Sequence, residues 1–496
     1  MRFLPITRPD GEGFEGLRLR LPAWHGVAGE LAPGMLDHLS IEKAINFPLG
    51  CYSSFLSSKR HENKLWPIRK STPRALPPPS TLPSSSVFLP LHPPTQLHLA
   101  PAKSFSPPSL PPGTLKLNDP LSNLFSNRYW GKRDTKLNLP TNSSLSVTLS
   151  QADLRTHTTA ACSSTFTENS LWLNGEAQDV SGARQTACFR ELKALRKKLE
   201  DANPSLPKLS EYYVHVVSEN NFPTAAGLAS SAAGFAALVR AIADLYELPE
   251  SPTELSKIAR QGSGSACRSL FGGYVAWEMG QAVDGSDSCA VEVAPASHWP
   301  EMKAVILVVS AAKKGVSSTA GMQATVNTSA LFTHRFRNVV PKTMEAMKAA
   351  IKNKDFEQFA AHTMADSNQF HAVCLDTTPP IFYMNDVSRA AIRAVEALNT
   401  LEGRAVGAYT FDAGPNAVIY YQEKDEEKVL GFLGALLAPE VAEWAGKYAK
   451  VAPGYDNRPF EALKDGVSRV ILTRVGEGPI KTDDALIGAD GLPSKR

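Results

Sequence analysis

One short stretch of the chain gathers groups that can hold an anion. Residues 262–268 read GSGSACR, so glycines, two serine hydroxyls and the guanidinium of Arg268 fall within seven positions. A guanidinium presents a planar fork of donors that fits a carboxylate through two parallel hydrogen bonds. The stretch therefore predicts a binding site for an oxyanion. The alternative from the residues alone is a polar loop with a surface arginine.

A second stretch has the form of a phosphate-binding turn. Residues 212–248 read YYVHVVSENNFPTAAGLASSAAGFAALVRAIADLYEL, which predicts a strand, a turn of small residues and a long Ala-rich helix. The N-terminus of a helix carries unpaired N–H groups and the positive end of the macrodipole, so an anion can bind there. The hydroxyls of Ser230 and Ser231 add donors. The alternative is an N-capped helix with small residues for close packing, and the Walker A pattern is absent.

A single carboxylate completes the set. Asp412 lies in the sequence TFDAGPN, before Gly414 and Pro415 and ahead of an apolar run. This pattern predicts a tight turn that presents the carboxylate to a cleft. A purely turn-forming aspartate is the alternative.

The elements that must position these groups begin after Arg128. Residues 183–202 place Cys188, Leu192, Leu195 and Leu199 at helical spacing, which predicts an amphipathic helix. Runs of β-branched and aromatic residues predict strands, and other segments predict helices. The strands are Tyr212–Val217, Ala304–Val309, Ala417–Tyr421 and Val467–Leu472, and the helices are Thr343–Lys352, Val387–Leu398 and Glu440–Lys450. No regular βαβ spacing is present, so we expect a mixed α+β architecture.

The first 127 residues have a different character. Residues 1–64 show no sustained periodicity, and residues 65–127 are rich in proline, which removes backbone donors and fixes φ. We expect a largely disordered, low-complexity extension over 1–127. A proline-rich ligand for a partner domain is the functional alternative.

Composition limits the class of protein. The 496 residues allow two or three domains, and the net charge of +3 does not favour nucleic acid as a partner. The six cysteines have no CxxC or metal-type spacing, which predicts reduced thiols in an intracellular protein and no zinc site. Because no apolar run reaches the roughly 18 residues that span a bilayer and the N-terminus lacks a secretory pattern, we expect a cytosolic protein without membrane insertion.

The phosphate-binding turn resembles the signature loop of the GHMP kinase superfamily, P-x-x-x-G-L-x-S-S-A, through Pro223, Gly227, Leu228, Ser230, Ser231 and Ala232. The resemblance implies ATP as co-substrate, with Mg²⁺ accompanying it and no protein metal ligands assigned. Its phosphates would be held by Gly227, Leu228, Ala229, Ser230 and Ser231.

Within that superfamily, several segments resemble mevalonate diphosphate decarboxylases. They are YWGKRD (129–134), LPTNSSLSVTL (139–149), GSGSACRSLFGGYVAW (262–277), KKGVSSTAGM (313–322) and AYTFDAGPNA (408–417). The resemblance implies a ribosomal-S5-like N-terminal lobe (128–300), a GHMP C-terminal lobe (301–484), a tail (485–496) and a homodimer. It assigns substrate binding to Tyr129, Trp130, Gly131, Lys132, Arg184, Ser263, Gly264, Ser265, Ala266, Cys267, Arg268, Ser318 and Thr319.

The same resemblance implies a reaction: ATP-dependent decarboxylation of (R)-5-diphosphomevalonate to isopentenyl diphosphate in isoprenoid and sterol biosynthesis. Asp412 would accept the proton of the tertiary hydroxyl, Arg268 would hold the carboxylate, and Lys132 would be a point charge for phosphate. Two alternatives stay open, a GHMP-type kinase that stops at phosphorylation and a catalytically inactive binding protein.

The chain departs from the family pattern before residue 129. Members begin with a strand of the form T-A-P-x-N-I-A that ends in lysine, whereas this chain reads NDPLSNLFSNRYWGKRD. We therefore expect the first strand to be missing, which leaves a sheet position unfilled. Arg128 stands where the lysine is expected, and this exchange is not conservative at a phosphate site.

Overall fold

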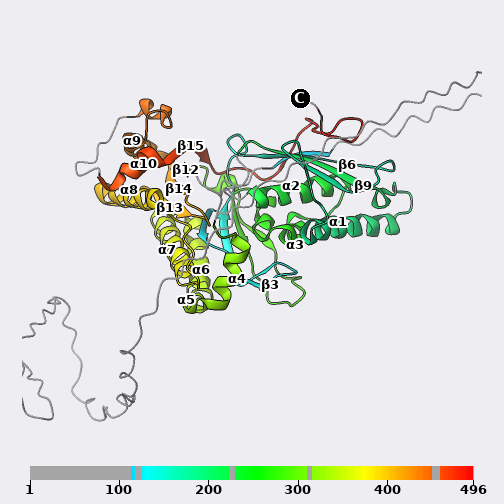
Figure 1. The fold of residues 1–496 in the computed structure, drawn as a ribbon, viewed down its shortest axis with the longest axis horizontal. Helices are drawn as coiled ribbons and strands as arrows, with labels where there is room; N and C mark the ends of the chain where they lie inside the picture. The colour runs from blue at the N-terminus through cyan, green and yellow to red at the C-terminus, as the bar shows by residue number, and fades with distance from the viewer. Residues whose placement is uncertain (1–112, 118–123, 223–229, 310–314, 449–457, 495–496) are drawn as a thin grey trace, which may run out of the picture. The chain divides into compact units, whose positions relative to one another are not determined.

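The computed structural model describes residues 113–117, 124–222, 230–309, 315–448 and 458–494 (Figure 1). The predictions for residues 1–112 and for the turn at 223–229 lie outside these ranges. All the described residues belong to the unit that spans residues 101–496.

Two mainly antiparallel sheets form the N-terminal lobe. A six-stranded sheet has the order β16-β1-β6-β9-β7-β8, a four-stranded sheet has the order β11-β10-β5-β2, and β3 pairs with β4. The strands are β1 (Gly113–Leu117), β2 (Leu124–Asn127), β3 (Lys132–Asp134), β4 (Leu139–Pro140), β5 (Ser144–Val147), β6 (Thr156–Ser163), β7 (Ser170–Leu173), β8 (Glu176–Gln178), β9 (Tyr213–Asn220), β10 (Tyr274–Trp277), β11 (Ala290–Ala294) and β16 (Ile480–Lys481).

Helices cover one face of the six-stranded sheet (Figure 1). They are α1 (Ala183–Ala202), α2 (Ser230–Leu245) and α3 (Pro252–Gly262), with short 3-10 helices η1 (Leu209–Glu211) and η2 (Gly264–Leu270). The small side chains of α2, such as Ala232 and Ala236, are buried among strand residues, so this helix lies close to the sheet. Gly262 at the end of α3 allows a still closer approach, because a Cβ there would lie 2.1 Å from the Phe235 ring.

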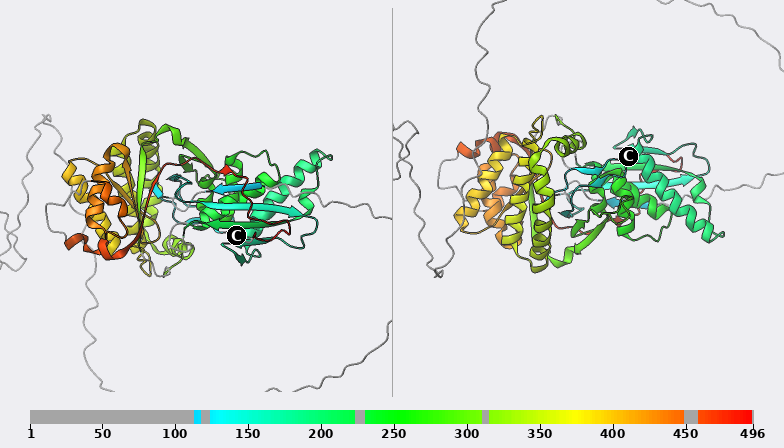
Figure 2. Two further views of the ribbon diagram at one scale, coloured as in Figure 1. Left: turned by 90° about the horizontal axis from the view of Figure 1, so that it is seen from above. Right: turned by 90° about the horizontal axis from the view of Figure 1, so that it is seen from below.

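The C-terminal lobe has one antiparallel sheet flanked by helices. Its strand order is β13-β14-β12-β15, and both views in Figure 2 keep its yellow and orange helices apart from the green helices of the other lobe. The elements are η3 (Ala296–His298), β12 (Met302–Val309), α4 (Ser318–Thr328), α5 (Ala330–His334), the π-helical turn η4 (Arg335–Val339), α6 (Val340–Asn353), α7 (Phe356–Leu375), α8 (Asp386–Glu402), β13 (Ala408–Phe411), β14 (Ala417–Gln422), η5 (Glu423–Asp425), α9 (Glu426–Leu436), η6 (Glu443–Lys447), η7 (Arg458–Phe460), α10 (Glu461–Gly466) and β15 (Val467–Arg474).

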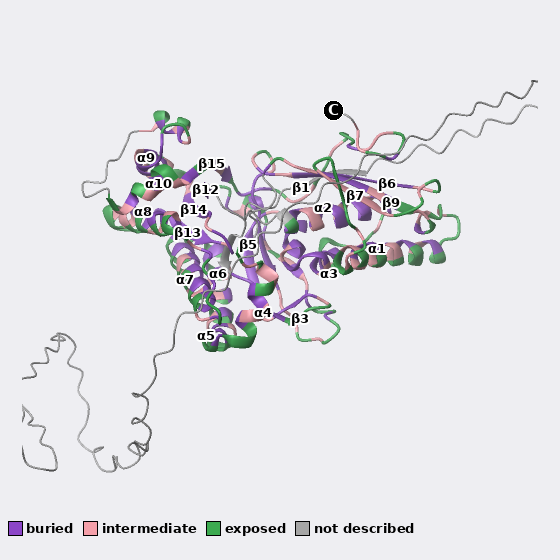
Figure 3. Ribbon diagram, in the orientation of Figure 1, coloured by how far each residue is buried: buried purple, intermediate pink, exposed green. Residues whose placement is uncertain are grey.

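A continuous apolar core joins the lobes. Leu145 and Val147 of β5 pack in one cluster with Phe359 and Tyr420 of the C-terminal lobe, and Figure 3 shows buried residues along β5 between the lobes. Burying this surface provides the dominant stabilisation of the arrangement. Groups carried by either lobe are thereby held in a fixed relation.

We expected the first strand to be missing, but strands do pair in this part of the N-terminal lobe, so the expectation of an unfilled sheet position is wrong. β1 lies between β6 and β16, with Leu115 opposite Thr158, and β2 pairs with β5. Residues 113–117 follow the last of a proline cluster and precede Pro120, so this GTLKL segment keeps every backbone donor that a central strand needs.

Most other predicted elements are confirmed within four residues at each end, but two details are wrong. Residues 440–450 do not form an α-helix in their described part, because only the 3-10 turn η6 occurs there. Ala442 and Ala445 are buried at a spacing of three, which suits a 3-10 turn. In α1, Leu195 and Leu199 are half-buried, whereas Arg196 and Glu200 are buried as a 2.9 Å ion pair.

Candidate active site

Asp412 lies directly after β13, in the turn that connects this strand to β14. Its backbone carbonyl accepts a hydrogen bond from the Gly414 amide at 2.6 Å, which makes the predicted tight turn. The Asp412 side chain keeps 33% of its surface exposed, whereas the strands on either side are buried. The hairpin therefore holds a carboxylate that solvent or a ligand can still reach.

Arg128 is the ion-pair partner of this carboxylate. Its Nη1 lies 3.1 Å from Asp412 Oδ1 and its Nη2 donates to the Thr410 hydroxyl at 2.9 Å. The planar fork of Arg128 thus spans two positions of the same strand end. Burial lowers the pKa of Arg128, while the charges of Asp412 and Asp366 act in the opposite direction.

A buried ion pair supports Arg128 from behind. Asp366 in α7 accepts the Arg128 backbone amide at 2.8 Å and pairs with Arg335 at 2.7 Å. Burial raises the pKa of Asp366, and the neighbouring Arg335 lowers it. His371, on the same helix, stays neutral because burial and Arg128 lower its pKa to about 3. The helix therefore fixes the backbone that carries Arg128.

Arg268 is fully buried in η2 rather than on the surface, so the surface-loop alternative is wrong. Its Nε donates to Ser146 at 3.1 Å, its Nη1 donates to Ser144, and its guanidinium lies 5.7 Å from the Trp277 ring. Ser144 and Ser146 alternate on β5 and so share a face. Leu145 between them is opposite Asn127, which immediately precedes Arg128. The serines that hold Arg268 therefore lie on β5, and Arg128, which holds Asp412, directly follows the adjacent strand β2.

The segment after Arg128 runs between these groups. The Tyr129 ring packs 4.7 Å from Trp277, and burial raises the pKa of its hydroxyl above the ordinary value. Gly131 has φ +86°, and a Cβ there would lie 2.6 Å from Phe332. The Trp130 side chain is buried, with its indole N–H 3.0 Å from the Thr325 hydroxyl, so it supports the segment from inside the protein.

Lys132 and Arg184 are two neighbouring cationic side chains near Tyr129. Burial, followed by the charge of Arg184, lowers the pKa of Lys132 to about 8. Arg184 Nη2 donates to the Thr319 hydroxyl at 3.1 Å, which links α1 to the first turn of α4. Ser318 and Thr319 are the first residues of α4, and Ser317 caps the helix by accepting the Ala320 amide. The predicted residues Arg184 and Thr319 are thus brought together although they are 135 positions apart.

The start of α2, which follows the predicted phosphate-binding turn, contacts residues 262–268, the segment predicted to bind an oxyanion. α2 begins at Ser230 as predicted, and the Ser231 hydroxyl lies 3.2 Å from that of Ser263. Gly264, Ala266 and Cys267 are buried behind them, and burial raises the pKa of Cys267 to about 12, so it is a neutral thiol. Ser265 is half-buried. Gly227, Leu228 and Ala229 lie outside the described residues.

Sequence reasoning missed several supporting residues. Asp366, Arg335 and Thr410 lie far from Arg128 in the sequence, and no local pattern identifies them. Ser144 and Ser146 carried a signal, since hydroxyls at alternate positions of a strand predict one polar face. Within the described ranges, no group of three or more His, Cys, Asp or Glu side chains could hold a metal ion.

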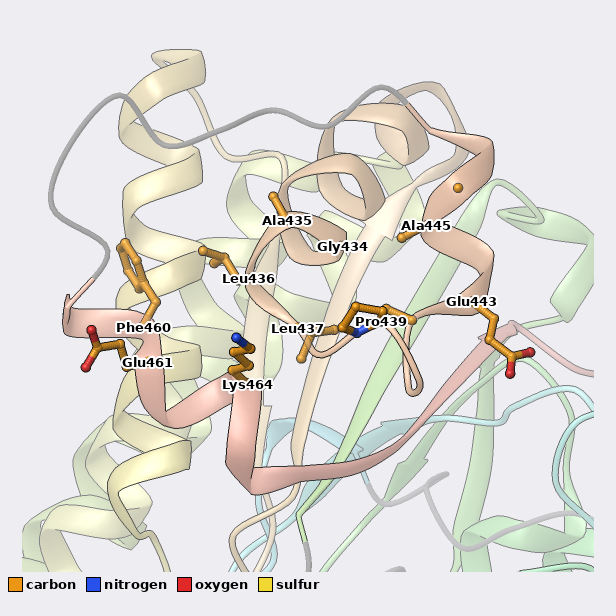
Figure 4. Close-up of a pocket in the computed structure, with 12 residues that line it drawn as sticks. Gly434, Ala435, Leu436, Leu437, Pro439, Glu443, Ala445, Phe460, Glu461 and Lys464 are labelled. Carbon is orange, nitrogen blue, oxygen red and sulfur yellow. The ribbon is translucent and has the colours of Figure 1, made fainter.

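The described cavities lie elsewhere. A cavity of about 580 Å³ is lined by residues of α9, η6 and α10, including Gly434, Ala445 and Lys464 (Figure 4). It contains none of the predicted site residues, and its walls lack a paired cation and carboxylate of the kind that Arg128 and Asp412 form. We assign it no role. None of the helices in the described part of the chain has both the length and the apolar character needed to cross a bilayer.

Comparisons with known proteins cover both lobes. A family model for the diphosphomevalonate decarboxylase-like N-terminal domain matches residues 123–290, and one for the mevalonate 5-diphosphate decarboxylase C-terminal domain matches residues 304–482. The diphosphomevalonate decarboxylase of Gibberella zeae is 68% identical over 361 residues, which cover 72% of this chain and 94% of that protein. The Saccharomyces cerevisiae diphosphomevalonate decarboxylase is 56% identical over 385 residues, covering 75% and 97%.

Solved structures have the same fold. An X-ray structure of mevalonate 5-diphosphate decarboxylase is 54% identical with a TM-score of 0.71, covering 77% of this chain and 100% of that one. A protein designated MDDEF, solved in complex with MVAPP, AMPPCP and magnesium, is 30% identical with a TM-score of 0.58, covering 76% and 100%.

Proposed function

Since the chain belongs to the diphosphomevalonate decarboxylase family of the GHMP superfamily, we propose that Asp412, Arg268 and Lys132 are the residues through which it acts. It catalyses the ATP-dependent decarboxylation of (R)-5-diphosphomevalonate to isopentenyl diphosphate, CO₂, ADP and phosphate. The observation that carries the assignment of roles is the partly exposed Asp412 carboxylate. It is held by the buried Arg128, which directly follows β2, and β2 pairs with the strand that anchors Arg268.

Asp412 acts first, as a general base. The tertiary hydroxyl of the substrate attacks the γ-phosphorus of ATP, and its proton passes to the Asp412 carboxylate. Arg128 orients this carboxylate through Nη1, and the Thr410 hydroxyl fixes the other arm of the fork. Phosphorylation of the tertiary hydroxyl is needed because hydroxide is a poor leaving group, whereas phosphate departs readily.

Arg268 acts in the second step. As phosphate leaves C3, positive charge develops there, and the electrons of the bond to the carboxylate carbon form the new double bond with release of CO₂. The guanidinium holds the carboxylate in line with the breaking bond. The serine hydroxyls of β5 hold Arg268 so that the alignment does not depend on a mobile side chain.

ATP and Mg²⁺ are required for the phosphoryl transfer. The described residues fit a bound triphosphate: the exposed Ser231 side chain stands in the first turn of α2 and contacts Ser263 of the oxyanion segment. Mg²⁺ neutralises phosphate charge when bound, and such ions commonly keep phosphate and water ligands. Ser231 and the α2 N-terminus then orient the γ-phosphate toward the hydroxyl.

The assignment is tested by product analysis. With diphosphomevalonate and ATP, the purified full-length chain should release one CO₂ and one phosphate for each ADP formed. A GHMP-type kinase would form ADP without CO₂, and an inactive binding protein would be stabilised by ATP without forming any ADP. Either of these results would overturn the proposal.

The pKa of Lys132 gives a pH prediction. Because its ammonium is charged mainly below about pH 8, KM for diphosphomevalonate should be nearly constant below pH 7 and rise above pH 8. The K132R variant stays protonated over this range, so its KM should lack this rise. Equal pH profiles for the two proteins would contradict a role for the Lys132 charge in substrate binding.

The unliganded protein provides an independent check on Lys132. Its pKa in the folded state lies below the ordinary value of 10.5, so between about pH 8 and 10.5 the unfolded chain binds the extra proton. The Lys132 contribution to stability therefore rises with pH in this window. Urea unfolding should show this rise in the wild type and not in K132R.

We also propose a homodimer in the cytosol. The cytosolic location is supported by the free thiols of Cys162, Cys188, Cys267, Cys289 and Cys374. The homodimer is supported by exposed apolar side chains near the ends of α5 and α7, Leu331, Leu375 and Phe382.

A further inference from the structure

Asn142 is a buried residue whose side-chain amide bonds to the backbone on both sides of Tyr129. It lies two residues before β5, and only 1% of its surface is exposed. Its side-chain nitrogen donates to the Arg128 carbonyl at 2.8 Å, and its side-chain oxygen accepts the Trp130 amide at 3.4 Å. A carboxamide carries a donor and an acceptor as a peptide group does. The Asn142 side chain therefore pairs with this segment in the way that a neighbouring strand would.

The pairing between β2 and β5 ends where the Asn142 side chain begins to bond. The last pair places Asn127 opposite Leu145, and the register shifts just before it. Such irregularities commonly end strand pairing and redirect a side chain beside an active site. The ladder thus stops one residue before Arg128. Asn142 makes the closer of two side-chain contacts with the Arg128 carbonyl, since the Arg335 guanidinium lies 3.5 Å from it.

Asn142 also joins this segment to the strand that holds Arg268. The Asn142 nitrogen donates a second hydrogen bond, to the Ser143 carbonyl at 2.7 Å. The next residue, Ser144, begins β5 and accepts a hydrogen bond from Arg268. One buried side chain therefore connects Arg128, which orients the proposed general base, with the start of the strand that anchors the proposed carboxylate-binding arginine.

We propose that Asn142 is a positioning residue for the reaction, whose amide sets where the Arg128 guanidinium meets the Asp412 carboxylate. It also keeps this pair in register with Arg268. The inference rests on the proposed function and adds to it a residue that acts through Arg128. From the other lobe, Asp366 of α7 accepts the Arg128 amide at 2.8 Å. The two backbone polar groups of Arg128 are thus held from both lobes, as a precisely placed catalytic partner requires.

The N142A variant removes the amide and leaves the proposed catalytic groups in place. Its kcat should fall about 10-fold, less than the roughly 10²-fold expected of a 1 Å displacement, because Asp366 still holds the Arg128 amide. KM for ATP should stay within about 2-fold, since the α2 N-terminus that would bind the phosphates is unchanged. A native kcat in N142A, measured well below its Tm, overturns the proposal.

A double-variant cycle separates positioning from a general loss of packing. If Asn142 acts through Arg128, kcat of N142A/R128M should lie within about 3-fold of kcat of R128M, because the side chain to be positioned is already gone. Independent effects would multiply, so the double variant would be about 10-fold slower than R128M. That result would show that Asn142 acts elsewhere and would contradict the proposal.

The matched control is N399A. Asn399 of α8 also bonds to the backbone, since it donates to the Gly407 carbonyl at 2.9 Å and accepts the Val406 amide at 2.8 Å. These bonds lie before β13, at the end of the strand away from Asp412. The N399A variant should lose thermal stability and keep kcat. Equal losses of kcat in N399A and N142A would mean that lower stability alone slows the reaction, and the positioning role would fall.

The N142S variant keeps the proposal testable if N142A does not fold. A serine side chain is too short to bridge the two carbonyls that Asn142 joins, so kcat should fall in N142S as well. A native kcat in this variant overturns the proposal. Failure of the proposed function is recognised separately, since the wild-type protein would then release no CO₂.

Discussion

The D412N variant should turn over about 10²- to 10⁴-fold more slowly than the wild type, the contribution expected of a positioned general base. Asparagine keeps the shape of the side chain and can still accept a hydrogen bond from Arg128 Nη1. It cannot accept the proton of the tertiary hydroxyl. Affinity for ATP should remain within about 2-fold, since the α2 N-terminus is unchanged. The measurement is steady-state CO₂ release together with ATP binding by calorimetry.

The control for D412N is D425N. Asp425 is also paired with an arginine, Arg404, but it lies at the start of α9 and is 1% exposed. Its variant should lose stability, because the buried Asp425 carboxylate loses its charge and the pair with the partly exposed Arg404 is weakened, and should keep kcat. Near-native kcat in D412N, or an equal loss of kcat in D425N, would contradict the catalytic role of Asp412.

The R128M variant should lose about 10²-fold in kcat, the scale expected when a reacting group is displaced by about 1 Å. Methionine can fill part of the space beside Phe370, where the guanidinium lies 5.2 Å from the ring centroid. It leaves the Asp412 carboxylate without its ionic partner. KM for ATP should change little, so the loss should appear in kcat and not in ATP binding.

The R128K variant is the matched control because it keeps the charge. Lysine can pair with Asp412 but cannot also bond to Thr410 through a planar fork. We expect kcat within about 10-fold of the wild type, above that of R128M. Arg128 is not the positioning residue if R128M keeps native kcat, or if R128K is as slow as R128M.

Local patterns were sufficient for the elements that carry the site. The β-branched run at 304–309 predicted β12, which is buried on both faces, and the helical period at 183–202 predicted α1, which packs one apolar side in the core of the N-terminal lobe. The turn before α2 and the turn at Asp412 depend on glycine, proline and serine at neighbouring positions, which the sequence shows directly. Resemblance to a family then indicated that these separate turns serve one reaction.

Long-range pairings could not be predicted in this way. Arg128 and Asp412 are 284 positions apart, and only the packing of α7 against β2 and β13 brings them together. The presence of β1 was also missed, because a proline-rich composition was extended over a short segment that itself lacks proline.

The most direct test of the central claim is a crystal structure of the full chain with diphosphomevalonate and a non-hydrolysable ATP analogue. We expect an Asp412 carboxylate oxygen within about 2.6–3.2 Å of the tertiary hydroxyl, the substrate carboxylate on Arg268, and the triphosphate at the N-terminus of α2 beside Ser231. A substrate whose carboxylate lies away from Arg268, or whose hydroxyl is out of reach of Asp412, would contradict it.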